Sequence, residues 1–246
     1  MSATLIGTSH GTDDPAGQAA VRALLDGVRV ARPGLDVREA FVDVQQPEVG
    51  DVLAEAVRDP AGAGAVVVPV LLSTGYHVRH DIAQAVAAVN AASDGAAVAA
   101  EPLGPHPLLV DILADRYAAA EAAHGPFRSD DAVVLAAAGS SVAAAATAVE
   151  EVTSALAQRL GRPITPSYGA GAEPRVPDAV AAARAATAGR VIVVSYLLAP
   201  GYFLDRVLEA GADVVTDPVA GPAGADKADP RLVQVVLDRY DAAVSA

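Results

Sequence analysis

The sequence predicts an α/β protein made of two similar halves, each a small parallel β-sheet flanked by helices. Short, Val-rich apolar segments alternate with longer segments of helical periodicity. Hydrophobic residues make up 52% of the chain but aromatic residues only 4%, a composition that suits helices packed on buried parallel strands. Segments of the first half also recur in order in the second half.

Four strands and four helices are expected in the first half. The strands are predicted at residues 4–8, 35–42, 65–72 and 96–100. The helices are predicted at about residues 15–31, 49–57, 82–91 (with the pattern visible from Val78) and 105–123. The run over residues 65–72 has no polar face, which indicates a strand covered on both sides. Alternation at these lengths indicates right-handed crossovers between parallel strands.

A duplication explains the second half. Three matches, at offsets of 128, 126 and 123 positions, pair Gly11 with Gly139, His77 with Phe203, and residues 115–117 with 238–240. One match could arise by chance, but three in the same order indicate a repeat. The expected domains are therefore residues 1–125 and 126–246, joined at a turn-rich segment near residues 124–126.

All five histidines lie in the first half. His10 and His77 each follow a predicted strand, at the carboxyl end where open α/β sheets bind their ligands. The second half has Ala138 and Phe203 at the matching positions. A single histidine at a turn is often structural, but the loss of both from the second copy favours a chemical role. The first half is therefore predicted to carry the chemistry, and the second to form the other wall of a cleft.

Two imidazoles and a carboxylate suit a divalent first-row metal ion such as iron, cobalt, nickel or zinc. The carboxylate is Asp43, which follows the second predicted strand. The same imidazoles could accept protons near neutral pH. His80 is expected on a helix surface or beside the metal ligands, His106 at a helix start, and His124 in a solvated linker.

Composition excludes several other classes. A net charge of −13 argues against nucleic-acid binding. The absence of cysteine excludes disulfides, thiolate zinc sites and cysteine nucleophiles. A phosphate-loop motif is absent. The N-terminal residues do not look like a signal peptide, and no apolar run approaches ~20 residues. We therefore expect a cytoplasmic protein without a membrane span.

Three motifs together resemble a known family: Ser9-His10-Gly11-Thr12, residues 69–82 around His77, and Pro-Leu-Gly-Pro-His-Pro at 102–107. They are similar to those of the sirohydrochlorin chelatases of the class II chelatase superfamily, which insert iron or cobalt into sirohydrochlorin. The resemblance covers both halves and is closest to the long form, in which two fused halves replace a homodimer. It implies a monomer with pseudo-dimeric halves and no permanently bound cofactor, since the divalent metal, Fe²⁺ or Co²⁺, is a substrate.

The resemblance also implies a site. His10 and His77 would be the catalytic, metal-binding pair, and Asp43 a further metal ligand. The family often has glutamate at this last position, so the aspartate here is one methylene shorter. Contacts to the tetrapyrrole are expected from Ser9, Gly11, Thr12, Leu72 and Arg79.

The function expected from this resemblance is insertion of Fe²⁺ into sirohydrochlorin in sirohaem biosynthesis. Insertion of Co²⁺ for cobalamin biosynthesis is the near alternative. A non-catalytic metal or tetrapyrrole carrier on the same fold is an alternative of a different class. A protoporphyrin-type ferrochelatase fits less well, because the repeated architecture and the low aromatic content count against it.

Overall fold

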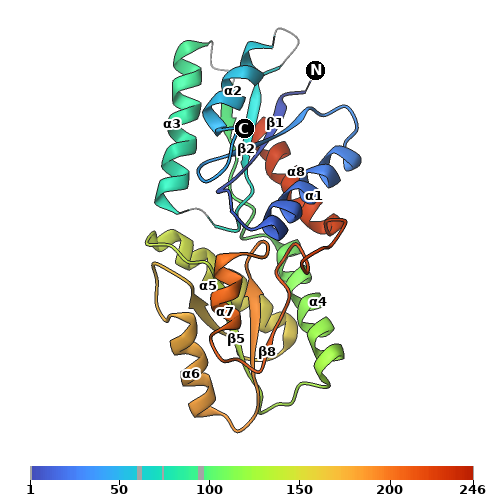
Figure 1. Ribbon diagram of the computed structural model, residues 1–246, viewed down its shortest axis with the longest axis vertical. Helices are drawn as coiled ribbons and strands as arrows, with labels where there is room; N and C mark the ends of the chain where they lie inside the picture. Colours follow the sequence, from blue (N-terminus) through green and yellow to red (C-terminus); the bar gives the residue numbers. More distant parts are fainter. Residues whose placement is uncertain (1, 60–62, 74, 94–96, 246) are drawn as a thin grey trace. The chain divides into compact units, whose positions relative to one another are not determined.

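The chain folds into two α/β units, each built on a sheet of parallel strands, which confirms the predicted fold class. A computed structural model describes residues 2–59, 63–73, 75–93 and 97–245 (Figure 1). Unit 1 comprises Met1–Leu103 together with Gly224–Ala246, and unit 2 comprises Gly104–Ala223. None of the described helices is both long and apolar enough to cross a membrane.

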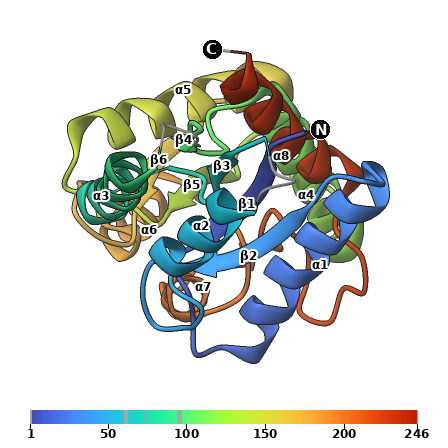
Figure 2. The same ribbon diagram turned by 90° about the horizontal axis from the view of Figure 1, so that it is seen from above.

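Unit 1 is built on a four-stranded sheet of order β2-β1-β3-β4, in which every pair is parallel. Its elements are β1 (Thr4–Ser9), α1 (Pro15–Ala31), β2 (Val37–Phe41), α2 (Val49–Arg58), β3 (Ala65–Pro69), α3 (Tyr76–Ala92), β4 (Ala97–Ala99) and α8 (Pro230–Val244). Helices α2 and α3 pack together on one face, and α1 and α8 pack together on the other (Figure 1, Figure 2).

Both faces of this sheet are buried, which explains the apolar runs of its strands. Alternate residues point to opposite sides, so Ile6 and Val67 join the core beneath α2 and α3, whereas Leu5 and Val66 lie on the other face. All six residues of β1 are buried. A strand covered on both sides gains from branched apolar residues along its whole length.

Unit 2 repeats the architecture with the sheet order β6-β5-β7-β8, again all parallel. Its elements are α4 (Pro107–His124), β5 (Ala132–Ala137), α5 (Ala143–Leu160), β6 (Thr165–Tyr168), α6 (Val176–Ala186), β7 (Val191–Tyr196), α7 (Tyr202–Leu208) and β8 (Val214–Val215). Helices α6 and α7 cover a core that includes Val134, Val193 and Val207. Helices α4 and α5 pack against each other in the same unit.

The last helix of each sequence half belongs to the compact unit of the other half. Helix α4 follows the first sheet in sequence but lies in unit 2, and α8 follows the second sheet but lies in unit 1. Matching arginines hold them: Arg116 Nη2 donates to the Val219 carbonyl at 3.2 Å, and Arg239 Nη2 donates to the Leu103 carbonyl at 3.0 Å. The boundary near residue 125 thus describes the predicted sequence repeat, whereas the compact units exchange their final helices.

Two predicted boundaries near His77 were wrong. The strand predicted over residues 65–72 ends at Pro69, although the Val70 N–H still donates to the Thr8 carbonyl at 2.8 Å. Helix α3 begins at Tyr76, earlier than the periodicity indicated. Gly75 precedes it as the N-cap residue, so His77 lies in the first helical turn.

Candidate functional site

The candidate site lies where the strand order of unit 1 reverses. The chain passes from β1 to β2 on one side and then to β3 on the other. The loops that leave β1 and β3 therefore diverge, and in open α/β sheets such a switch point at the carboxyl ends of the strands is where ligands bind. His10 directly follows β1, and its side chain is exposed. His77 is the second residue of α3, the helix that follows β3.

Backbone hydrogen bonds fix the loop after β1 against the loop after β2. The Asp43 N–H donates to the His10 carbonyl, and the Val42 N–H donates to the Ser9 carbonyl, both at 3.0 Å. Gly11 has a φ of +94°, and a Cβ on it would lie 2.3 Å from the Asp43 carbonyl oxygen. Only glycine permits this approach, so His10 and Asp43 are held on adjacent loops by their backbones.

The Asp43 side chain is exposed and is oriented by its own loop. Its Oδ1 accepts a hydrogen bond from the Val44 N–H at 2.7 Å. The Gln45 N–H donates to the Asp43 carbonyl at 2.6 Å, which closes a tight turn. Asp43 therefore presents an exposed carboxylate from a backbone-defined turn on the loop next to that of His10, and a carboxylate can serve as a metal ligand or a proton acceptor.

The complete metal triad stays a prediction. The side chain of His77 lies outside the described residues. Among the side chains that are described, no group of three or more His, Asp or Glu residues lies close enough to hold a metal ion. The sheet topology brings the backbone positions of His10 and Asp43 together and places His77 after the neighbouring strand.

The five predicted substrate-contact residues lie in different surroundings. Ser9 is buried at the end of β1, and Leu72 is only 8% exposed, whereas Arg79 is exposed on α3. The Thr12 N–H donates to Gln45 Oε1 at 3.0 Å, so this group already has an acceptor within the chain. Gly11 shapes the loop, as described above. Contacts from these five residues to a tetrapyrrole stay predictions.

The free N–H groups at the start of α1 also have acceptors within the chain. The Asp14 carboxylate accepts hydrogen bonds from the Ala16 N–H at 2.7 Å and the Gly17 N–H at 3.2 Å. This is an ordinary N-cap, followed by a proline at the first helical position. The first turn of α1 therefore already holds a carboxylate of the protein itself.

Two residues at this edge escaped the sequence reasoning. Gln45 ties the two loops together through the Thr12 N–H. Val44 occupies a left-handed backbone conformation with a φ of 60°. Neither residue type signals such a role by itself, because glutamine is common on surfaces and valine is rare in turns. The duplication held the clue to Val44, since the matching residue is a glycine.

Unit 2 reproduces these loops without the chemical groups. The Ala170 N–H donates to the Ala138 carbonyl at 2.8 Å, as the Asp43 N–H does to the His10 carbonyl. Ala138 therefore matches His10, as predicted, and Ala170 matches Asp43. Phe203 is the second residue of α7, as His77 is of α3.

The remaining histidines are placed largely as predicted. His106 is the N-cap of α4, where its Nδ1 accepts from the Leu108 N–H at 3.2 Å. His80 is exposed on α3. His124 is exposed as the last residue of α4, rather than in a linker.

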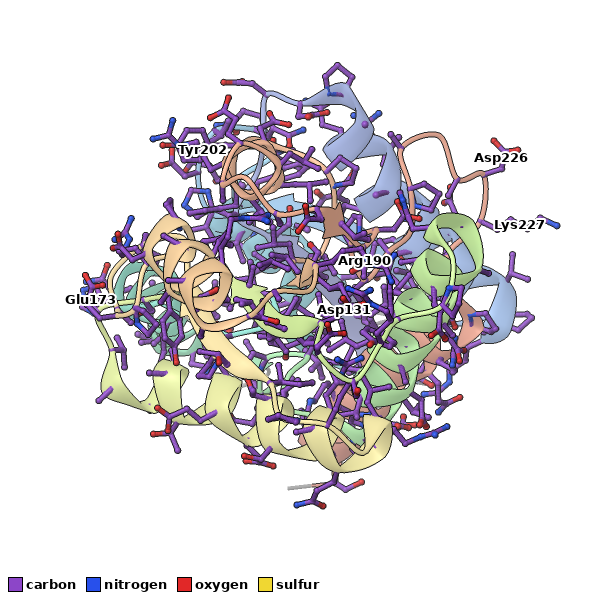
Figure 3. The ribbon with its side chains drawn as sticks, turned by 90° about the horizontal axis from the view of Figure 1, so that it is seen from below. Asp131, Glu173, Arg190, Tyr202, Asp226 and Lys227 are labelled. Carbon is purple, nitrogen blue, oxygen red and sulfur yellow. The ribbon has the colours of Figure 1, made fainter. Side chains whose placement is uncertain are left out.

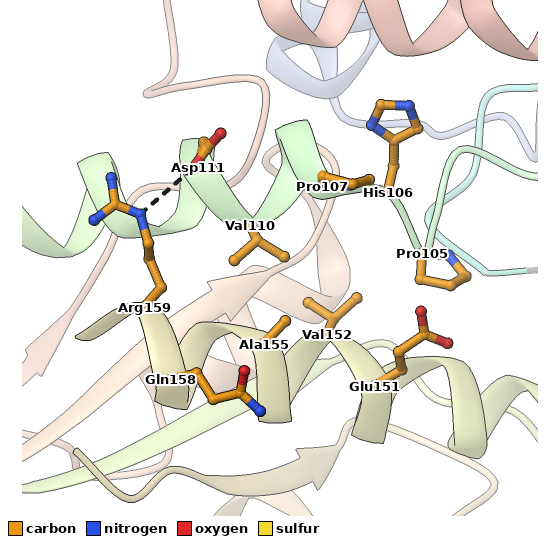
Figure 4. A pocket seen from close by; sticks show the side chains of 10 residues that line it. All are labelled: Pro105, His106, Pro107, Val110, Asp111, Glu151, Val152, Ala155, Gln158 and Arg159. Atoms are coloured by element: carbon orange, nitrogen blue, oxygen red, sulfur yellow. Dashed lines mark hydrogen bonds and ion pairs between the residues drawn. The ribbon is translucent and has the colours of Figure 1, made fainter. Parts of the chain in front are cut away.

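A hollow of about 500 Å³ lies between α4 and α5 in unit 2 (Figure 4). An ion pair between Asp111 and Arg159, with 3.5 Å between Oδ1 and Nε, crosses it (Figure 4). His106 lines one end, but its ring is already used in the helix cap. The hollow contains none of the residues predicted to bind metal.

A strongly lowered pKa belongs to a structural carboxyl group of unit 2, that of Asp131 (Figure 3). Burial alone would raise its pKa. Hydrogen bonds from the N–H groups of Arg128 and Arg190, both at 2.8 Å, and from the Arg190 guanidinium outweigh this and lower the pKa to about 2. The Asp131 side chain is fully buried, so it supports the fold rather than a ligand.

The fold and the loops of unit 1 define a class: a twice-repeated parallel α/β protein with candidate metal ligands at one switch point. The CbiX family model matches residues 4–120 and 132–243, which cover both repeats. The chain belongs to the CbiX family.

Known proteins resemble the chain in sequence and in fold. The sirohydrochlorin cobaltochelatase of Methanothermobacter thermautotrophicus is 28% identical over 128 residues, which cover 44% of this chain and 85% of that protein. The structure of SirB from Bacillus subtilis with Fe³⁺ superposes with a TM-score of 0.80 at 18% identity, covering 98% of this chain and 95% of that one. CbiX, described as the terminal enzyme of sirohaem biosynthesis in denitrifying bacteria, gives 0.64 at 22% identity, with 98% and 99% covered. At these identities the structures establish the fold alone.

Proposed function

We propose that this protein is a sirohydrochlorin chelatase, an enzyme that inserts a divalent metal ion into sirohydrochlorin. The observation that supports it is the switch point of unit 1, where histidines follow both β1 and β3 while the matching residues of unit 2 are Ala138 and Phe203. Membership of the CbiX family and the cobaltochelatase name of one relative support this choice.

The reaction exchanges one divalent cation for two pyrrole protons. His10 and His77 would each serve in turn as a metal ligand and a proton acceptor, because neutral imidazole does both near neutral pH. The Asp43 carboxylate, set beside the His10 loop, would add a hard oxygen ligand and lower the positive charge at the site. In this scheme the metal ion is a substrate that leaves with the product, and it is not a resident cofactor.

We propose Fe²⁺ as the physiological metal, with sirohaem as the product. Co²⁺ is the second candidate, and the cobaltochelatase relative favours it. Intrinsic affinity cannot discriminate in favour of iron, since imidazole and carboxylate sites bind Co²⁺ more tightly than Fe²⁺. Discrimination would therefore depend on insertion rates or on metal supply.

A turnover assay tests the proposal. Purified protein, metal-free sirohydrochlorin and either Fe²⁺ or Co²⁺ are mixed without oxygen, and product is followed by absorbance. Many products per protein molecule are expected, with iron used at least as efficiently as cobalt when the two compete. A single stoichiometric uptake would instead indicate a carrier. Insertion into protoporphyrin but not into sirohydrochlorin would contradict the substrate.

A further inference from the structure

Val44 has a backbone conformation that does not suit its residue type. Its φ of 60° lies in the left-handed region, and among the described residues it is the one non-glycine residue with a positive φ. Branched side chains are genuine outliers there because the Cβ substituents crowd the backbone. Strain of this kind persists only where the surrounding structure holds it, and it gathers at functional sites.

The core does not account for the valine. Its side chain is 50% exposed, so half of an apolar group faces solvent at a strained position. Its N–H donates to Asp43 Oδ1, but any residue except proline supplies that donor. Neither burial nor hydrogen bonding therefore requires a branched apolar residue at this position.

Unit 2 has a glycine at the turn position that Val44 occupies in unit 1. The matching residue is Gly171, 127 positions later, with a φ of +70°. The turn bond is the same: the Ala172 N–H donates to the Ala170 carbonyl at 2.9 Å, as the Gln45 N–H does to the Asp43 carbonyl at 2.6 Å. A Cβ on Gly171 would lie 2.4 Å from the Ser140 carbonyl carbon. Backbone fills this space in unit 2, whereas unit 1 leaves room for a side chain.

The valine stands directly beside the candidate metal ligands. The Val44 Cβ lies 3.2 Å from the point where a Cβ on Gly11 would be. Gly11 directly follows His10 in the sequence. Asp43 precedes Val44 and is bonded to its N–H. An exposed apolar group thus lies on the turn that follows Asp43 and packs beside Gly11, the residue after His10.

We propose that Val44 is a substrate-contacting residue that presents an apolar surface to the flat ring face of the tetrapyrrole while the metal is transferred. The inference rests on the proposed function, since the ligand is the macrocycle of that reaction. Its side chain carries no charge, so it contacts the ring face and not the peripheral carboxylates. The strained turn brings the methyl groups of Val44 to the edge where His10 and Asp43 lie.

The decisive variant is Val44→Gly, which relieves the strain and removes the apolar group together. The melting temperature should rise by about 2–4 °C, while the Kd for metal-free sirohydrochlorin and the KM should rise about tenfold. The value of kcat should change less than KM. A purely structural residue would not combine a more stable fold with weaker binding.

Two further variants sharpen the test. Val44→Asn is close in size and tolerates a positive φ, so it should also gain stability and lose binding. Val30→Ala, which trims an 80% exposed valine on α1, should leave Kd and KM unchanged. Normal binding by Val44→Gly, or by Val44→Asn, would overturn the apolar contact while the wild type still turns over. A wild type that neither binds nor metallates sirohydrochlorin would refute the proposed function, and this inference with it.

Discussion

The two units build the same pair of loops from different residues. In unit 1 the loops contain His10, Asp43 and Val44, and in unit 2 the matching residues are Ala138, Ala170 and Gly171. The bonds between the loops have nearly the same lengths, 3.0 Å in unit 1 and 2.8 Å in unit 2. Since alanine and glycine are sufficient for the backbone, the fold does not need the groups found in unit 1.

One position in these loops, in contrast, is the same residue in both units: Gly11 in unit 1 and Gly139 in unit 2. Gly11 and Gly139 both have a positive φ, and a Cβ on either would collide with the carbonyl oxygen of the facing loop, at 2.3 Å and 2.0 Å. Both copies keep the glycine because the close approach of the loops requires it. The comparison therefore separates residues that the architecture needs from residues that only the chemistry would need.

The largest effect should come from removing an imidazole from unit 1. We expect His10→Ala and His77→Ala each to lower the insertion rate by about 100-fold or more, because each removes a proposed ligand and proton acceptor. The rate of metallated product formation is the measurement, and circular dichroism should show an unchanged fold, since Ala138 supports the same loop geometry in unit 2. Unchanged turnover in both variants would contradict the site.

A second test asks whether unit 2 contributes stability rather than chemistry. Asp131→Asn should lower the free energy of unfolding by about 2 kcal/mol, because the buried carboxylate loses its charge-assisted bonds to Arg190. Insertion per folded molecule should stay the same. A variant that is stable but inactive would place chemistry in unit 2.

The stability difference between wild type and Asp131→Asn should depend on pH, because the pKa of Asp131 is lowered in the folded protein. The carboxyl has a pKa of about 2 in the folded protein against its ordinary value of 3.8. Its contribution is complete above the ordinary value and disappears as the pH falls toward 2. The stability gap between wild type and Asp131→Asn should therefore narrow in acid, as followed by denaturant titration between pH 5 and about 2.5.

Local patterns in the sequence predicted most of the fold. The helix predicted at residues 15–31 is α1 with the same bounds, because an N-cap, a proline and a clear apolar face mark it. The buried runs at β1 and β3 were equally clear. The start of α3 was placed too late because the apolar pattern is visible only from Val78, whereas the helix begins at Tyr76.

The exchange of the last helices lay beyond sequence patterns. Helices α4 and α8 both carry Asp-Arg-Tyr, at residues 115–117 and 238–240, and both present a buried apolar face. Such helices suit either sheet, so the choice between sheets is made by tertiary packing. The turn at Val44 was hidden for a related reason, since valine does not signal a positive φ.

The exchange itself can be tested through its two arginines. Arg116→Met and Arg239→Met should each lower stability by about 1 kcal/mol, or about 2–4 °C in melting temperature, since each removes a bond to the carbonyl of Val219 or Leu103. Thermal melts of the two variants give the comparison. Similar losses of stability would show that the same arginine–carbonyl bond stabilises α4 and α8 in their units. A loss confined to Arg116→Met would show that other contacts hold α8 in place.

The smallest effects are expected at the histidines away from the switch point. His124 ends α4 with an exposed side chain, and it is its carbonyl, not its ring, that accepts from Arg190 Nη1 at 3.0 Å. Truncation to alanine keeps that bond and removes only an exposed ring at the helix C-terminus. Insertion by His124→Ala should stay within about twofold of wild type, a change too small for a lost ligand or proton acceptor. His80→Ala, on the exposed side of α3, should behave alike in the same assay. A loss at either position as large as that of His77→Ala would move the chemistry away from the β1–β3 switch point, and the contrast between His10 and Ala138 would then no longer locate the site.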